Sequence, residues 1–225
     1  MSDRPREESG LDLQDVAGIE PAVVDAMSIE QLSESVNALA KRDRRRLQWT
    51  CENDLRDDRK VAVSEQRVRA AKFLVALLSE SIDAIESLVA LRSSRWRYEV
   101  HFSLFLFVGD ARLLHGPTLD RRILDLLGSY LMTVKTRTAL AAWKAADTIA
   151  SCWSITDARA RLEAAAMTGA YVSGRLAALS GLEEILEKQA GAERSRIQAV
   201  IRSMCLRDRS ARVRRAASFE LSGGE

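Results

Sequence analysis

The sequence is poor in the residues that interrupt helices. Its 225 residues include only three prolines, and aromatic residues make up 5% of the chain. Pro5, Pro21 and Pro117 lie outside or near the ends of the helical patterns, so long stretches are free to form helices. Runs of β-branched and aromatic residues are scarce, and no segment has the pattern of a strand. These absences predict an all-α protein.

Cysteine, targeting signals and long apolar runs are also scarce. The three cysteines, Cys51, Cys152 and Cys205, are odd in number and widely spaced, which argues against a disulfide framework. The sequence has no CxxC motif and no Cys/His cluster, so we expect no zinc site. The charged first residues lack the apolar core of a signal peptide, and the longest strongly apolar run, Phe73–Leu78, is far shorter than a membrane span. We therefore expect a cytoplasmic protein with no membrane association, no metal and no cofactor.

The motifs of common enzyme classes are missing. There is no Walker A loop, no GxGxxG after a strand and no GxSxG elbow. Carboxylate pairs such as Glu183 and Glu184 are adjacent in sequence, and neighbours on a helix point about 100° apart. His101 lies in an apolar stretch and is expected to be a hydrogen-bonded core residue. We predict no catalytic residue and no enzymatic activity.

The helical patterns divide the chain into four parts. Residues 1–27 are expected to form a disordered or loosely docked leader, and residues 222–225 a tail. Residues 28–80 contain three helices that form a divergent repeat or a cap, and Ser28 with Gln31 fits a capping box at their start. Residues 81–221 are predicted to form four helical hairpins: 81–93 with 95–114, 118–133 with 136–152, 156–170 with 173–189, and 192–206 with 210–221.

An arginine recurs in the second half of the chain. Arg97, Arg137, Arg175 and Arg214 are separated by 38 to 40 residues. Around the last of them, the segment Leu206–Ala217 resembles the junction between the two helices of a HEAT repeat, whose period is about 40 residues. The resemblance implies a right-handed α-solenoid of HEAT-like hairpins over residues 81–221. An irregular helical bundle is the alternative fold.

The recurring arginines have two interpretations. The HEAT resemblance implies that each pairs with an aspartate near the turn, with Asp208 serving Arg214 and Asp157 serving Arg175. Alternatively, the arginines line the concave face and bind an anionic ligand. The candidate binding residues on that face are Arg97, Arg137, Arg175, Arg214 and Trp96.

The four tryptophans divide into core and surface candidates. Trp96 lies between two arginines and is the best candidate for an exposed aromatic residue with basic neighbours. Trp143 and Trp153 are expected to lie in the core. For Trp49 the sequence does not decide between the core and the surface.

The resemblance favours a binding protein. HEAT-like solenoids present an extended concave surface, so the leading hypothesis is a non-enzymatic adaptor or scaffold that binds another protein. The net charge is only +2, but the stretch from Gly191 to Glu225 holds eight arginines against four acidic residues. Nucleic-acid binding through an arginine-lined concave face is therefore the alternative. A third hypothesis, by analogy with HEAT-like phycobilin lyase subunits, is an enzyme partner or lyase. An apolar repeat edge could also support a homodimer.

Overall fold

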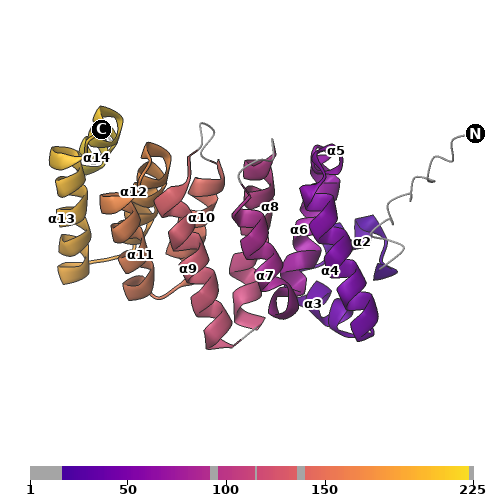
Figure 1. The fold of residues 1–225 in the computed structure, drawn as a ribbon. Helices are drawn as coiled ribbons and strands as arrows, with labels where there is room; N and C mark the ends of the chain where they lie inside the picture. The colour runs from indigo at the N-terminus through magenta and orange to yellow at the C-terminus, as the bar shows by residue number, and fades with distance from the viewer. Residues whose placement is uncertain (1–16, 92–95, 115, 136–139, 223–225) are drawn as a thin grey trace, which may run out of the picture.

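The computed structural model describes residues 17–91, 96–114, 116–135 and 140–222. Within these ranges every regular element is a helix (Figure 1). This result confirms the all-α prediction for the described part of the chain. None of the helices in these ranges is long and apolar enough to cross a lipid bilayer.

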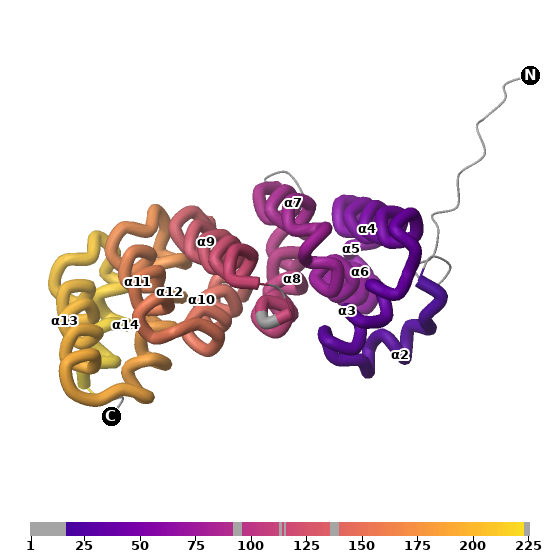
Figure 2. The backbone as a smooth tube through the Cα atoms, turned by 90° about the horizontal axis from the view of Figure 1, so that it is seen from below, coloured from indigo at the N-terminus to yellow at the C-terminus, as the bar shows by residue number. Residues whose placement is uncertain are grey.

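The longer helices form two rows. Row A consists of α4 (Lys41–Arg56), α7 (Leu78–Val89), α9 (Pro117–Thr133), α11 (Ile155–Thr168) and α13 (Gly191–Arg207). Row B consists of α6 (Ser64–Ala76), α8 (Arg97–Ala111), α10 (Leu140–Cys152), α12 (Val172–Glu187) and α14 (Ala211–Leu221). Each row A helix packs against the row B helix that follows it, and the resulting pairs succeed one another along the molecule (Figure 1). Figure 2 views the helices roughly end-on, with α4, α7 and α9 on one side of α6, α8 and α10.

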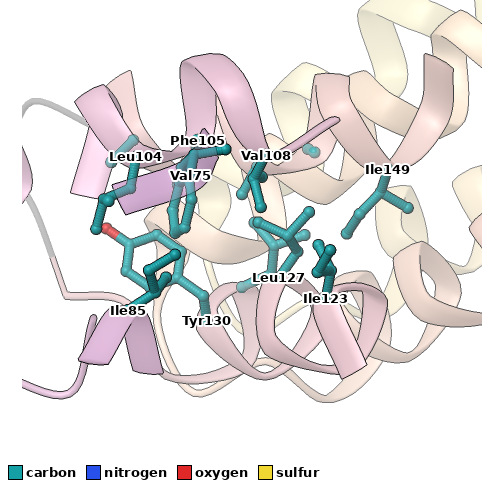
Figure 3. Packing of buried hydrophobic residues seen from close by; sticks show 14 of the residues in the cluster. Val75, Ile85, Leu104, Phe105, Val108, Ile123, Leu127, Tyr130 and Ile149 are labelled. Atoms are coloured by element: carbon teal, nitrogen blue, oxygen red, sulfur yellow. The ribbon is translucent and has the colours of Figure 1, made fainter. Parts of the chain in front are cut away.

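The core runs without interruption through the successive pairs. Figure 3 shows side chains from α6 to α10 packed against one another, among them Phe105, Leu127, Tyr130 and Ile149. Alanines occupy the buried face of α10, and their small side chains allow close packing against α8 and α12. Each pair therefore buries its apolar faces against its neighbours, which it could not do alone.

Ion pairs join neighbouring helices of row A. Arg44 pairs with Glu80 at 2.8 Å, Arg122 with Glu86 at 2.6 Å, and Arg161 with Asp125. In each case the two residues are 36 residues apart in sequence. These side chains are partly exposed, so each pair contributes less than about 1 kcal/mol. Their common spacing shows that about 36 residues carry the chain from one row A helix to the next.

Two short helices cover the N-terminal end of row B. Helices α2 (Pro21–Ala26) and α3 (Ile29–Asn37) pack on α6, and the predicted capping box is confirmed at α3 by a 3.2 Å hydrogen bond from the Gln31 amide to the Ser28 hydroxyl. The remaining elements among the described residues are α5 (Asp58–Val61) and a short 3-10 helix, η1 (Arg112–Leu114). Because α3 also contacts α8, the two short helices cover row B at α6 and at part of α8.

Residues 17–27, which the sequence placed in a disordered or loosely docked leader, are docked on α6. Lys72 of α6 is 6% exposed and donates hydrogen bonds of 2.6 Å to the carbonyl oxygens of Val24 and Met27. Arg69 pairs with Asp25 at 2.7 Å. The carbonyl oxygens at the end of α2 have no partner within the helix, so the ammonium group of Lys72 is a suitable donor for them. Burial of this group lowers the pKa of Lys72. Residues 1–16 lie outside the described residues.

Candidate binding surface

The outward face of α10 carries large apolar side chains. Leu140 is 61% exposed and Trp143 is 45% exposed. They lie three residues apart, on the face opposite the buried alanines of the same helix. The prediction that Trp143 lies in the core is therefore wrong. The alanines, rather than the tryptophan, provide the buried face of α10.

These side chains line a groove across row B, which we call the row B groove. Its volume is about 330 Å³, and its lining comes from α8, α10 and α12: Phe102, Leu140, Trp143, Lys144, Asp147, Ser180, Gly181 and Glu184. At Gly181 a Cβ atom would lie 3.0 Å from the side chain of Leu162 and 3.2 Å from the Ala146 carbonyl oxygen. Glycine thus allows α12 to lie close to α10 and α11 at this point of the groove.

Carboxylates dominate the edge of the groove. Asp147 and Glu184 line it, and Glu183, Glu187 and Glu220 lie beside them on α12 and α14. Two lysines neutralise part of this charge, because Lys144 pairs with Asp147 at 2.7 Å and Lys188 pairs with Glu184 at 2.7 Å. The four carboxylates of Asp147, Glu184, Glu187 and Glu220 outnumber the two ammonium groups and leave the surface acidic.

Glu183 has an unusual protonation equilibrium. Burial raises its pKa, and the nearby carboxylates of Glu220 and Glu187 raise it further, to about 8. Desolvation penalises the charged form, and like charges penalise it again. At neutral pH this side chain is therefore largely a neutral acid that can donate a hydrogen bond.

This shift predicts a pH-dependent stability. Between the ordinary pKa of 4.5 and about 8, the folded protein holds a proton on Glu183 that the unfolded chain releases, so the stabilisation present below pH 4.5 is lost as the pH rises through 8. Glu183→Gln should raise the free energy of unfolding at pH 8 by about 1–3 kcal/mol and change it little at pH 4.5. Urea unfolding at several pH values measures this. Glu184→Gln is the control and should leave the slope unchanged, and an unaltered slope in Glu183→Gln would contradict the assignment.

The predicted arginine ladder is not formed on this surface. Arg175 is 2% exposed, and its guanidinium group binds both carboxylate oxygens of Asp208, at 2.7 and 3.1 Å. Arg214 instead donates to the Asp208 carbonyl oxygen at 2.7 Å, and Asp157 accepts the hydroxyl of Ser154. The predicted pairings of Asp208 with Arg214 and of Asp157 with Arg175 are therefore wrong. Because Arg175 is buried in an ion pair, it is not available to a ligand.

The remaining predicted site residues also lie elsewhere. Arg97 is half-buried at the start of α8, where its guanidinium carbon lies 4.6 Å from the centre of the Tyr98 ring and Nη2 donates to the Tyr98 hydroxyl at 2.9 Å. Trp96 is half-buried against the core, so it is not the exposed aromatic residue that was expected. Arg137 lies outside the described residues.

The other aromatic and histidine predictions have clear outcomes. Trp153 is half-buried against the core and donates from Nε1 to Asp120 at 3.1 Å, while Trp49 on α4 is 63% exposed. The prediction that His101 is a satisfied core residue is confirmed, because it is 3% exposed and both ring nitrogens have partners.

Metal-ligating side chains do not cluster in the part of the chain that the structure describes. Among them, no group of three or more His, Cys, Asp or Glu side chains is arranged to hold a metal ion, and the three cysteines are unpaired thiols. Comparison of the chain with protein-family models, curated proteins and solved structures gave no match in any of the three.

Proposed function

We propose that this chain is a non-enzymatic adaptor that binds another protein in the row B groove. The bound segment would combine an apolar anchor, placed against Trp143 and Leu140, with lysine or arginine residues that meet the acidic edge. We also propose that the stacked pairs form a right-handed HEAT-like solenoid with row B on its concave side. The recurring arginines and the 36-residue spacing of the row A ion pairs support that assignment.

The observation that carries the proposal is the exposure of Trp143 within a groove. Tryptophan contributes heavily to protein interfaces because it buries a large rigid surface, particularly at the centre of a depression. A 45% exposed tryptophan beside a 61% exposed leucine is costly to leave in water unless a partner covers it.

The charge around the groove favours a basic partner. Oppositely charged surfaces attract each other, accelerate association and exclude partners of like charge. Nucleic-acid phosphates would meet the carboxylates of Asp147, Glu184, Glu187 and Glu220. This surface therefore disfavours the nucleic-acid alternative.

Removal of the tryptophan side chain should abolish most of the binding. Helical peptides selected from a display library on the wild-type protein should be enriched in apolar residues flanked by Lys or Arg. Trp143→Ala should weaken their binding by at least about 30-fold, corresponding to a loss of about 2 kcal/mol. Titration calorimetry of the selected peptides measures the loss.

The matched control is Trp49→Ala, which removes an exposed tryptophan from row A. It should leave the affinity unchanged. Equal losses in the two variants would contradict the groove as the binding site. Tight binding of duplex DNA with a steep salt dependence, together with failure to select peptides, would favour the nucleic-acid alternative.

A further inference from the structure

One face of α4 is basic and carries an exposed tryptophan. Trp49 is 63% exposed, and Arg42 and Arg45 precede it by seven and four residues, so the three side chains share one face of the helix. Lys41 and Arg46 flank this face and are also exposed. We call these five residues the α4 basic face.

The positive charge of the α4 basic face is not neutralised by the described residues. None of its four cations forms a side-chain hydrogen bond or ion pair with another residue of the described ranges. Two carboxylates lie near them on α4. Glu52 pairs with Arg56 at 2.8 Å, and Asp43 lies one turn before Leu47, on the buried side of the helix. The face therefore presents an excess of positive charge to the solvent around a large apolar side chain.

This face points away from the rest of the molecule. α4 is the first helix of row A, so no earlier pair covers it (Figure 1). It packs mainly on α6, through a buried stripe that includes Leu47, Cys51 and Leu55. Trp49 lies about half a turn from that stripe, on the opposite side of the helix. The α4 basic face therefore looks away from row B, whereas the row B groove lies on the other side of the molecule (Figure 2).

The α4 basic face has the features that the row B groove requires of a ligand. The groove offers apolar side chains, Trp143 and Leu140, beside an acidic edge. The face offers an indole and four cations within three turns of a helix that is already formed, so little ordering is needed on binding. Residues that dominate one side of an interface tend to meet such residues on the other side, and tryptophan and arginine are the commonest of them.

We infer that the partner of the row B groove is the α4 basic face of a second copy of this chain. The inference rests on the proposed function of the groove and names its occupant. Trp49 of one copy would lie against Trp143 of the next, and the cations of α4 would meet the acidic edge. The two surfaces differ and lie on opposite sides of the molecule, so a two-fold pair cannot use both. The copies therefore associate head to tail, with a vacant groove at one end of the assembly and an uncovered α4 at the other.

The assembly should grow with protein concentration. One helix against one groove is a small interface, so the association should be weak. In sedimentation equilibrium at low salt, the average mass should exceed the 25.0 kDa of one chain by at least about 1.5-fold at roughly 200 µM and match it near 1 µM. At low micromolar concentrations the chain stays monomeric, so Trp49→Ala remains the control for peptide binding.

Two variants that each lack one surface give the sharpest test. Trp49→Ala and Trp143→Ala change exposed side chains, and each variant alone should keep the mass of one chain. An equimolar mixture should form dimers and nothing larger. In that mixture Trp143→Ala supplies an intact α4 basic face, and Trp49→Ala supplies an intact groove.

Charge reversal tests the electrostatic part of the contact. Arg45→Glu places a carboxylate against the acidic edge, so this variant should stay monomeric at concentrations where the wild type assembles. The control, Arg121→Glu, makes the same change at an exposed position of α9, also in row A, and should assemble like the wild type. Raising the salt to about 0.5 M should weaken the association of the wild type by at least about 10-fold.

Three results would overturn the inference. The first is a wild-type protein that keeps the mass of one chain up to about 200 µM. If selected peptides still bind that protein and lose affinity in Trp143→Ala, the proposed function stands without the self-contact. The second is a wild type that assembles while the mixed variants form no dimer. The third is a single-stranded oligonucleotide that binds the monomeric wild type and not Trp49→Ala, which would assign the α4 basic face to nucleic acid.

Discussion

Asp208→Ala is expected to destabilise the protein by about 3–5 kcal/mol, because it leaves a buried guanidinium group without its carboxylate. Arg175 and Asp208 have side chains that are 2% and 7% exposed, so water cannot replace the lost partner. The same carboxylate also accepts the amide of Ser210 at 2.7 Å, just before α14. Domains are stable by only about 5–15 kcal/mol, so the loss is a large fraction of the total.

Urea unfolding followed by circular dichroism measures this loss, and hydrogen exchange locates it. Because each pair packs mainly on its neighbours, the loss of protection should concentrate in α11 to α14. Asp157→Ala is the control: this aspartate is exposed, and its removal should cost less than about 1 kcal/mol. Similar losses in the two variants would contradict the role of the buried pair.

A double substitution separates the ion pair from the general effect of substitution. Arg175→Met with Asp208→Asn removes both charges and keeps similar volumes. Apolar or neutral replacements of a buried pair are often much less costly than removal of one partner. The double variant should therefore be more stable than Asp208→Ala, and additive losses would show that the two charges do not interact.

The helices could be predicted because their signals are local. The spacing of apolar residues and the Ser28–Gln31 capping box depend on neighbours within a few positions, and both are present in the structure. The partner of Asp208 could not be predicted in this way. The HEAT resemblance implied Arg214, six residues away, whereas the carboxylate turns toward the preceding helix pair and binds Arg175, 33 residues away.

The candidate groove was predictable in part. Leu140, Trp143 and Asp147 share one face of α10 at helical spacing, while Ala141 and Ala145 belong to the other face. Trp143 was predicted to lie in the core because it sits in an apolar helical stretch. The helical spacing by itself predicts an exposed tryptophan beside a carboxylate on this face. A large exposed apolar side chain of this kind is unusual on a protein surface and often belongs to a binding site.

A cavity between α7, α8, α9 and the start of α12 had no counterpart in the sequence. Its lining runs from Glu86 to Tyr171, and only the packing of α7, α8, α9 and the start of α12 brings those segments together. Arg97 was identified because it recurs at a regular interval, but that interval says nothing of the tyrosines around it. Tertiary packing therefore determines its environment, as it determines that of Arg175.

A single methyl group on Gly174 should also destabilise the protein strongly. At this position in the first turn of α12, a Cβ atom would lie 1.9 Å from the carbonyl oxygen of Leu131 and 3.0 Å from its carbonyl carbon. These are backbone atoms at the end of α9, so they cannot turn aside as a side chain would. Gly174→Ala must therefore move the two helices apart.

That movement would break hydrogen bonds between α9 and the start of α12. The Ala170 amide donates to the Met132 carbonyl oxygen at 2.9 Å, and the Ser173 hydroxyl donates to that of Val134 at 2.9 Å. We expect a loss of about 2–4 kcal/mol from overpacking and from these bonds. This loss exceeds the gain of roughly 1 kcal/mol that alanine brings to a helix interior.

Gly128→Ala is the matched control, because it places the same methyl group inside α9. Its Cβ would lie 3.3 Å from the Arg161 side chain, which is long and flexible and can move at little cost. Helix propensity then dominates, so this variant should be neutral or up to about 1 kcal/mol more stable than the wild type in urea unfolding. If the two variants had equal stabilities, the close approach of α12 to α9 would not be a determinant of the fold. Opposite signs would show that a glycine is required where two backbones meet, whereas one facing a mobile side chain can be replaced.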